Sequence, residues 1–277
     1  MPRRKERPVG QPTRGKTARN RLRRIDNYLL MAEPALIRQT GGLFDQAYYV
    51  DLGYGAEPFT TLESAERLRR LNPTLRVLGV EIDPERVANS LPYTDALTQF
   101  RLGGFNLPLH DGETVRLIRA YNVLRQYEES EVVRAWQTMG QYLLPGGLLV
   151  EGTSDPYGRL CVTNLLRRFE DHLRYEGLLF STNFGWGFEP GMFQPVLPKN
   201  CIHRMVPGEK IHTFMMDWNQ AIRETAANQD WGLRQWFEAS AFALARHGYR
   251  LDLRRKFLRQ GYLLWKDGPT DNPVIRW

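Results

Sequence analysis

The chain has few cysteines and no long apolar run. Two of its 277 residues are cysteine, Cys161 and Cys201, and they lie far apart in the sequence. This excludes a disulfide-stapled scaffold and a cysteine-rich zinc site, and it favours a reducing compartment, the cytoplasm. No stretch approaches the roughly 18 apolar residues of a membrane span, so we expect no membrane segment. The five histidines lack the spacing of metal ligands, and we predict no metal site.

Excess positive charge is nearly confined to the start of the chain. Residues 1–24 contain ten Lys or Arg and one acid, Glu6, whereas the rest of the chain has slightly more acids than bases. Because the segment is almost free of apolar residues, we predict a basic, disordered arm over 1–24. It is either a solvated tail or a phosphate-binding arm that contacts RNA. Its low serine content disfavours a third role, an organelle transit peptide.

From residue 25 onward the pattern predicts one α/β domain, 25–277. Apolar runs at 47–52, 75–82, 98–102, 115–121 and 148–152 predict strands, and amphipathic spacing at 61–71, 84–91 and 130–143 predicts helices between them. Thr60 and Glu63 have the spacing of a capping box. Residues 153–200 are unassigned, apart from an aromatic-rich stretch at 181–193 that we expect to pack on the sheet rather than form a lid. Helices at 208–226 and 231–248 and two late strands follow. Repeated strand–helix units predict a largely parallel sheet whose ligands bind at the carboxyl ends of its strands.

The most informative segment is Val50–Pro58, VDLGYGAEP, in which a strand ending in an acid enters a Gly-x-Gly turn. It is not a Walker loop, and Pro58 stands where a dinucleotide-binding turn has its third glycine. Asp51 would also repel a pyrophosphate. A nucleoside with a cationic end in place of phosphates fits better, since Glu81, at the end of the next strand, can accept hydrogen bonds from both ribose hydroxyls.

Four motifs, VDLGYGAEPFTT, LGVEIDPERV, AYNVLRQY and LLPGGLLVEG, resemble in order and spacing those of class I S-adenosylmethionine-dependent methyltransferases. The resemblance covers about residues 45–155. It implies a Rossmann-like, doubly wound, mostly parallel seven-stranded sheet with an antiparallel late strand, and methyl transfer from S-adenosyl-L-methionine. The cofactor-binding residues that it implies are Asp51, Gly53, Tyr54, Gly55, Glu81, Ile82, Phe105 and Asn122.

The chain departs from the family pattern at two strands. After the third strand the family often has a Gly-Asp pair, but here Gly104 takes the place of the acid, with Phe105 or Asn106 as its substitute. The fourth strand usually opens with an acid, whereas this chain has Val115-Arg116. A catalytically inactive cofactor- or RNA-binding protein on the same fold is therefore the alternative to an enzyme.

The methyl acceptor is not legible in the sequence, and no catalytic residue is assigned. The chain has no N-P-P-Y motif and no cysteine directly after the fourth or fifth strand, so a small molecule and RNA both stay open as acceptors. Candidates by position after these strands are Arg125, Gln126, Tyr127, Thr153, Ser154, Asp155, Tyr157 and Arg159. A later basic stretch that could hold an acidic substrate contains Lys199, His203, Arg204 and Lys210.

Overall fold

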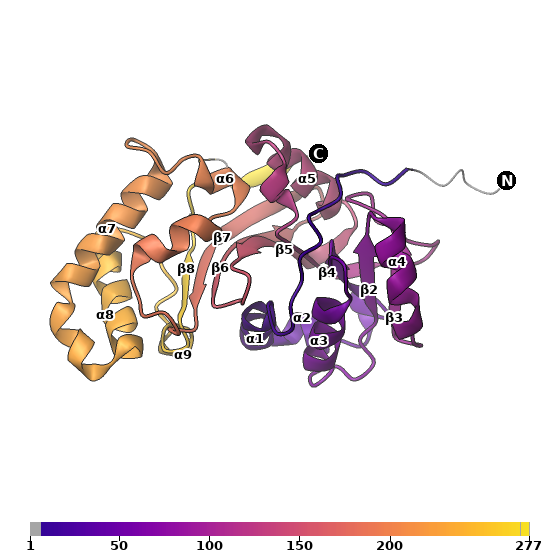
Figure 1. Ribbon diagram of the computed structural model, residues 1–277, viewed down its shortest axis with the longest axis horizontal. Helices are drawn as coiled ribbons and strands as arrows, with labels where there is room; N and C mark the ends of the chain where they lie inside the picture. The colour runs from indigo at the N-terminus through magenta and orange to yellow at the C-terminus, as the bar shows by residue number, and fades with distance from the viewer. Residues whose placement is uncertain (1–6, 272, 277) are drawn as a thin grey trace.

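The computed structural model describes residues 7–271 and 273–276 (Figure 1). The strands in this part of the chain are β1 (Tyr48–Leu52), β2 (Val77–Glu81), β3 (Thr98–Leu102), β4 (Val115–Tyr121), β5 (Leu143–Ser154), β6 (Leu160–Arg168), β7 (His172–Thr182), β8 (Tyr262–Trp265) and β9 (Val274–Arg276). They form one sheet in the order β3-β2-β1-β4-β5-β6-β7-β8, with β9 paired to β7.

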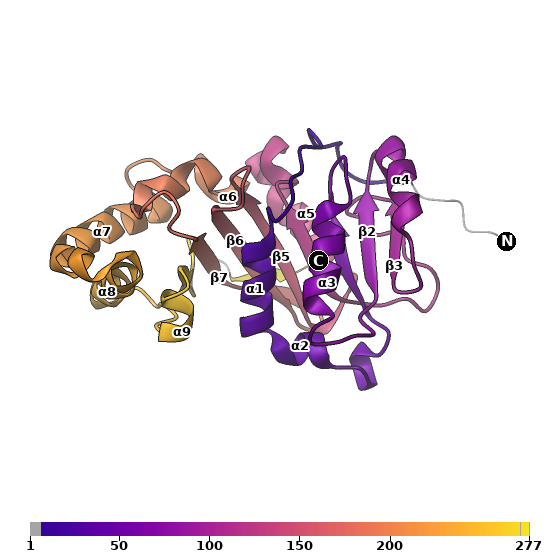
Figure 2. The ribbon, with the colours of Figure 1, turned by 60° about the horizontal axis from the view of Figure 1, so that its bottom comes forward.

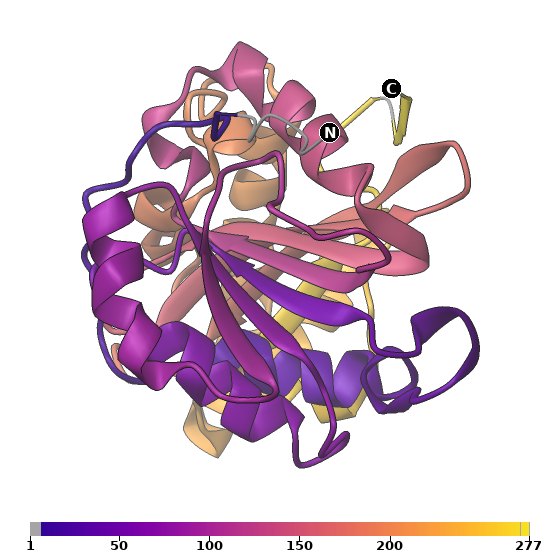
Figure 3. The ribbon, with the colours of Figure 1, turned by 90° about the vertical axis from the view of Figure 1, so that its right-hand side faces the viewer.

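Helices cover both faces of this sheet. They are α1 (Arg23–Ala32), α2 (Pro34–Arg38), α3 (Phe59–Leu68), α4 (Pro84–Ser90), α5 (Glu129–Gly140), α6 (Lys199–Ile202), α7 (Lys210–Glu224), α8 (Leu233–Arg246) and α9 (Arg255–Leu258). Short 3-10 helices span Gly42–Phe44, Leu91–Tyr93, Leu124–Gln126, Pro190–Val196 and Ala226–Trp231. Figure 3 shows α1 to α3 beneath the central strands and α5 above them.

The first five strands run parallel and give the doubly wound arrangement that the sequence predicts. β1 lies between β2 and β4, so Val50 is paired with Leu78 on one side and Ile118 on the other. Every residue of β1, β2 and β4 is buried, as expected for strands covered on both faces. The strand order reverses between β1 and β4, and such a switch point is where open α/β sheets bind ligands.

The second half of the sheet differs from the seven strands expected. β5, β6, β7 and β8 are joined in antiparallel pairs, and β9 adds to β7, so the sheet has nine strands within the described residues. The prediction of a late antiparallel strand is confirmed, but the predicted count was too low, because the unassigned 153–200 contains the hairpin strands β6 and β7. The aromatic-rich stretch packs as predicted, with Phe188 4% and Phe193 1% exposed in a core shared with α7 and α8.

Two local predictions about element ends need correction. The capping box predicted for Thr60 and Glu63 is wrong, because α3 begins at Phe59 after Pro58 as its N-cap, and the Thr60 hydroxyl donates to Asp51 instead. The strand predicted at 148–152 begins earlier, at Leu143, so Pro145-Gly146-Gly147 lies inside β5, where a Cβ on Gly147 would approach the Arg116 carbonyl to 2.8 Å. Only glycine permits this close contact between β4 and β5.

The described part of the basic segment, residues 7–24, lies against the domain, where the sequence predicts a disordered arm. Figure 2 shows it crossing above the upper ends of the central strands before it enters α1. Its contacts, given below, are mostly made by backbone groups and arginines, so its lack of apolar side chains did not reveal them. Among the described residues, no helix is long and apolar enough to cross a membrane.

One carboxyl group, that of Glu151, is buried in β5, and no cation in the described part of the chain forms an ion pair with it. Glu151 is 2% exposed, and the Asn164 side-chain amide donates to its Oε2 at 2.7 Å. The Tyr175 hydroxyl donates to the same amide's oxygen at 2.8 Å. Burial raises the pKa of Glu151 to about 7, because desolvation penalises the charged form more than the Asn164 hydrogen bond supports it.

This raised pKa predicts a loss of stability as pH rises. The stabilisation that Glu151 gives is fully present below its ordinary pKa of 4.5 and is lost as pH rises through about 7. The change amounts to about 3 kcal/mol of unfolding free energy. Glu151→Gln should lack this component, so urea unfolding at pH 5 and pH 8 should show a smaller fall in stability for the variant than for the wild type. Equal falls would contradict the assignment.

Candidate functional site

The Gly-x-Gly turn lies at the switch point, directly after β1. Gly53 and Gly55 have φ of +72° and +94°, conformations that side chains strain. A Cβ on Gly53 would come within 2.6 Å of Val123 Cγ2, so the turn also packs tightly against the segment after β4. Tyr54, between the two glycines, is buried and meets Phe100 edge-on, with ring centroids 5.4 Å apart.

Glu81 lies across this turn at the carboxyl end of β2. Its carboxylate is fully buried, and Oε2 accepts the Gly55 N–H at 3.0 Å while Oε1 accepts the Ile82 N–H at 2.9 Å. Arg86 approaches Oε1 to 3.7 Å. Oε1 also accepts the Asp83 N–H at 3.3 Å, so of the two lone pairs on each carboxylate oxygen one, on Oε2, is left for a hydroxyl group of a ligand.

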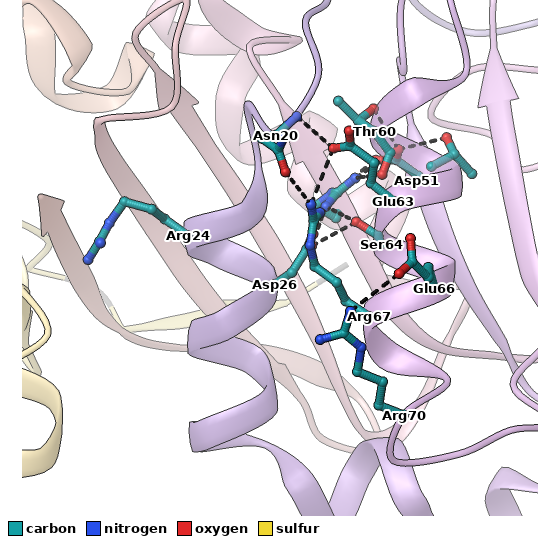
Figure 4. Close-up of polar contacts among 12 residues, drawn as sticks. Asn20, Arg24, Asp26, Asp51, Thr60, Glu63, Ser64, Glu66, Arg67 and Arg70 are labelled. Atoms are coloured by element: carbon teal, nitrogen blue, oxygen red, sulfur yellow. Dashed lines mark hydrogen bonds and ion pairs between the residues drawn. The ribbon is translucent and has the colours of Figure 1, made fainter. Parts of the chain in front are cut away.

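Asp51 has different partners from those that the sequence predicts. Its Oδ2 accepts the hydroxyls of Thr60 and Thr61 at 3.1 and 2.8 Å, and its Oδ1 accepts Nε of Arg119 at 3.0 Å (Figure 4). Arg119 is fully buried and also donates to Asp26 at 2.6 Å. The negative charge of Asp51 is therefore compensated inside the protein, and a cationic ligand is not needed to balance it.

The space beside Ile82 and Phe105 is largely filled by the basic segment. A gap of about 20 Å³, enough for one water molecule, is left between these residues, Val123, Tyr127 and the segment Val9–Thr13. A Cβ on Gly10 would lie 3.0 Å from the Tyr127 hydroxyl and 3.4 Å from Ile82 Cδ1.

The backbone of Val9 pairs with the loop after β3. Its carbonyl accepts the Phe105 N–H at 2.8 Å, and its N–H donates to Asn106 Oδ1 at 2.6 Å. The Gln11 N–H donates to the Tyr127 hydroxyl. These donors and acceptors are ones that the edge of a nucleobase could also use.

Further along, the segment is fixed to the turn and to β5. Arg86 donates to the Thr13 carbonyl at 2.9 Å, and the Gly15 carbonyl accepts the Ala56 N–H at 2.9 Å. Arg21 Nε donates to Ser154 Oγ at 3.1 Å. Gly15, with φ of +69°, fits this path because a Cβ there would meet Arg86 at 2.6 Å. The two glycines of this segment, Gly10 and Gly15, were the sequence signal that it follows a defined path.

Asn122 follows β4 and borders a cavity. Its Oδ1 accepts the Ser154 N–H at 3.0 Å, and its Nδ2 donates to Ser154 Oγ at 3.2 Å, so the side chain is held in place despite a φ of +60°. The cavity measures about 490 Å³, within the range of small-molecule sites. Its lining includes Thr13, Arg14, Gly15, Lys16, Thr17, Arg21, Asp51, Gly53, Tyr54, Gly55, Thr60, Tyr121, Asn122, Arg125 and Gln126.

The structure separates the other candidates predicted by position. Arg125 and Gln126 line the cavity, and Tyr127 lines the gap beside Phe105. Ser154 holds Asn122, while Thr153 and Asp155 are buried. Tyr157 is 66% exposed, and the Arg159 guanidinium stacks over it and over Trp186. The later basic stretch, which contains Lys199, His203, Arg204 and Lys210, lies outside the cavity wall. In it, Arg204 forms an ion pair with Glu129, and Lys210 forms one with Asp271.

Comparisons with known proteins give distant structural likenesses. No protein-family model and no curated protein matches the chain. Among solved structures, it is similar to the N-methyltransferase NodS from Bradyrhizobium japonicum WM9 in complex with S-adenosyl-L-homocysteine, with 20% identity, a TM-score of 0.34 and coverage of 52% of this chain and 67% of NodS. It is also similar to the sugar N-methyltransferase KedS8 from Streptoalloteichus sp ATCC 53650, with 19% identity and a TM-score of 0.30. The match covers 56% of this chain and 68% of KedS8. A third similar structure is the complex of the Haloferax volcanii Trm112 methyltransferase activator with its methyltransferase partner, with 25% identity and a TM-score of 0.29. The match covers 46% of this chain and 53% of the matched chain.

These TM-scores are all below 0.5, so the likenesses carry no weight for the function of this chain. The function of a fold of this kind depends on the residues at its switch point.

The buried Arg119 predicts a large stability difference between two arginine substitutions. Arg119→Met leaves the buried Asp26 and Asp51 carboxylates without their shared partner, which should lower the unfolding free energy by about 3–5 kcal/mol. Arg70→Met is the matched control, because Arg70, just after α3, pairs with Glu66 of α3 and the two side chains are 68% and 75% exposed (Figure 4). That change should cost less than about 1 kcal/mol. Urea denaturation of both variants tests this, and similar losses would contradict it.

Proposed function

We propose that this chain is an S-adenosyl-L-methionine-dependent methyltransferase. The observation that carries the proposal is Glu81, a buried carboxylate held across the Gly53–Gly55 turn at the switch point of a doubly wound sheet. An acid in this position is the usual partner of ribose hydroxyls in nucleotide-binding sheets of this kind. The four motifs that resemble the methyltransferase family place the same residue in the same role. We expect the protein in the cytoplasm, since its two cysteines are free and buried.

The residues present fit the cofactor in chemistry. Glu81 would hold the ribose, and Ile82, Phe105 and Val123 offer an apolar surface to the adenine ring. The Phe105 N–H and Asn106 Oδ1 form a donor–acceptor pair for the edge of that ring. When bound, the cofactor would supply an activated methyl group on sulfur. By the resemblance to the methyltransferase family, Asn122, which borders the cavity, would lie at the methyl end of the cofactor.

The fit in space requires one movement. Val9–Gln11 use the hydrogen-bonding groups that the adenine would need, and the gap of about 20 Å³ is too small for a ring. The anchors at Thr13 and Gly15 lie further along the chain, so residues 9–11 can leave while residues 13–24 stay. We infer that the cofactor and residues 9–11 bind in turn at the same place.

The chain's own residues would bind the cofactor, orient the side chains beside it and cover the cavity. Ser154 holds the Asn122 side chain at the cavity, and residues 13–17 form part of the cavity wall, which limits the access of water. Methyl transfer depends chiefly on alignment of the nucleophile with the methyl group. We assign no catalytic base.

A dinucleotide cofactor is the second candidate, because Asp51 is compensated by Arg119 and would repel a phosphate less than the sequence suggests. Two residues still disfavour it. Pro58, the N-cap of α3, has no N–H for a phosphate, and the acidic Glu57 precedes it.

Calorimetry with S-adenosyl-L-homocysteine and with NAD separates these two cofactors. We expect binding of the former, and a loss of at least tenfold in Glu81→Gln, because hydrogen bonds to a charged acceptor contribute about 1.5–3 kcal/mol each. Asp83→Asn is the matched control, since Asp83 caps α4 at the surface of the same strand end. Tight binding of NAD alone would contradict the proposal. An equal loss of affinity in both variants would mean that Glu81 is not the residue that binds the ribose.

Removal of residues 1–11 should raise the affinity for S-adenosyl-L-homocysteine at least threefold. The truncation removes the four hydrogen bonds at Val9 and Gln11, each worth about 0.5–1.5 kcal/mol. Hydrogen exchange supplies an independent readout in the intact chain, where the ligand should speed exchange of the Val9 and Gln11 amides but not of the Ala56 amide. Weaker binding by the truncated protein would mean that residues 9–11 support the cofactor instead.

A further inference from the structure

The wall of the 490 Å³ cavity has an imbalance of charge. Four cations line it, Arg14, Lys16, Arg21 and Arg125, and the single acid in the wall among the described residues is Asp51. Because Asp51 accepts hydrogen bonds from the buried Arg119, its charge is already compensated. No described acid forms an ion pair with any of the four cations.

Three of the four cations come from the segment predicted to be an arm, and the structure holds the guanidinium of Arg21 and the backbone between Arg14 and Lys16. Arg21 donates to Ser154 Oγ and to the carbonyls of Asp155 and Lys16, so its guanidinium is held at the cavity wall. Gly15, between Arg14 and Lys16, is hydrogen-bonded to Ala56 of the Gly-x-Gly loop. Arg125 faces the same space from the segment after β4. Like charges gathered around one cavity repel each other, and a bound anion would relieve that repulsion.

We propose that this cavity binds the anionic group of a small methyl acceptor, a carboxylate or a phosphate. The inference rests on the proposed function, since the cavity adjoins Asn122, where the methyl group would arrive. Arginine and lysine are the side chains that recognise both groups, through charge-assisted hydrogen bonds. The volume suits a small molecule, and residues 13–17 close part of the cavity.

The other cations of the segment favour a small acceptor over RNA. The Arg19 guanidinium lies 4.4 Å from the centre of the Phe59 ring, and Arg24 donates to Ser181 and to the Gln260 carbonyl. The side chains of Arg19 and Arg24 are thus engaged with the domain itself, and Arg14 and Lys16 are exposed residues that line the cavity. A nucleic acid strand that followed the described segment would have to compete with these contacts.

Calorimetry with citrate and with inorganic pyrophosphate tests the proposal and separates the carboxylate from the phosphate source. We expect at least one of them to bind, and the double variant Arg14→Gln/Lys16→Gln and the single variant Arg125→Gln each to weaken that binding at least tenfold. Arg134→Gln is the matched control, because Arg134 is an exposed cation on α5 outside the cavity wall. Its affinity for the anion should equal that of the wild type.

Each titration is repeated with saturating S-adenosyl-L-homocysteine, which tests the proposed function separately. Anion binding that persists beside this ligand supports an acceptor site. Anion binding that the ligand abolishes would mean that the cations serve the cofactor's own carboxylate, and this would overturn the inference. So would the absence of anion binding, or equal losses in Arg134→Gln. Tighter binding of a short single-stranded RNA, weakened by the same cavity variants, would replace the small acceptor with a nucleic acid.

Discussion

The arrangement of the site depends on one buried ion pair network, in which Arg119 stands between Asp26 and Asp51. Such charges cost free energy to bury, and they are tolerated only when geometry and hydrogen bonds are satisfied. Here Arg119 of β4 joins Asp51 of β1, Asp26 of α1 and, through Ser64, α3. The network thus fixes the start of α1 beneath the switch point. Because the basic segment leads directly into α1, the same contacts determine where that segment crosses the strand ends.

Much of the central fold could be predicted because its strands are short apolar runs buried on both faces. The turn at Gly53–Gly55 and the position of Glu81 at the end of β2 could also be predicted from the sequence. The role of Asp51 could not be predicted, because its partner Arg119 lies 68 residues away, in a strand whose pattern gave no sign of a buried charge. The hairpin of β6 and β7 also escaped prediction. It contains polar residues whose partners are distant in the sequence: Asn164 binds Glu151 and Asn200, and Arg167 binds Glu33 and Glu176.

The basic segment shows how composition can mislead when contacts are made by the backbone. Its residues bury little apolar surface, yet Val9 is hydrogen-bonded to the loop after β3, Thr13 to Arg86 of α4, and Gly15 to Ala56 of the Gly-x-Gly loop. Two parts of the segment act differently on this account. Residues 9–11 occupy the nucleoside side and would leave when the cofactor binds, whereas residues 13–21 are anchored and supply cations to the cavity. The beginning of the chain would thereby influence both the cofactor and the acceptor.

A crystal structure of the full chain with S-adenosyl-L-homocysteine tests the central claim most directly. The account predicts a ribose hydroxyl on Oε2 of Glu81 and the adenine between Ile82 and Phe105. Val9 should no longer contact Phe105, while Arg86 should still bind the Thr13 carbonyl. A nucleoside bound elsewhere, or Val9 still hydrogen-bonded to Phe105 in the occupied site, would contradict it.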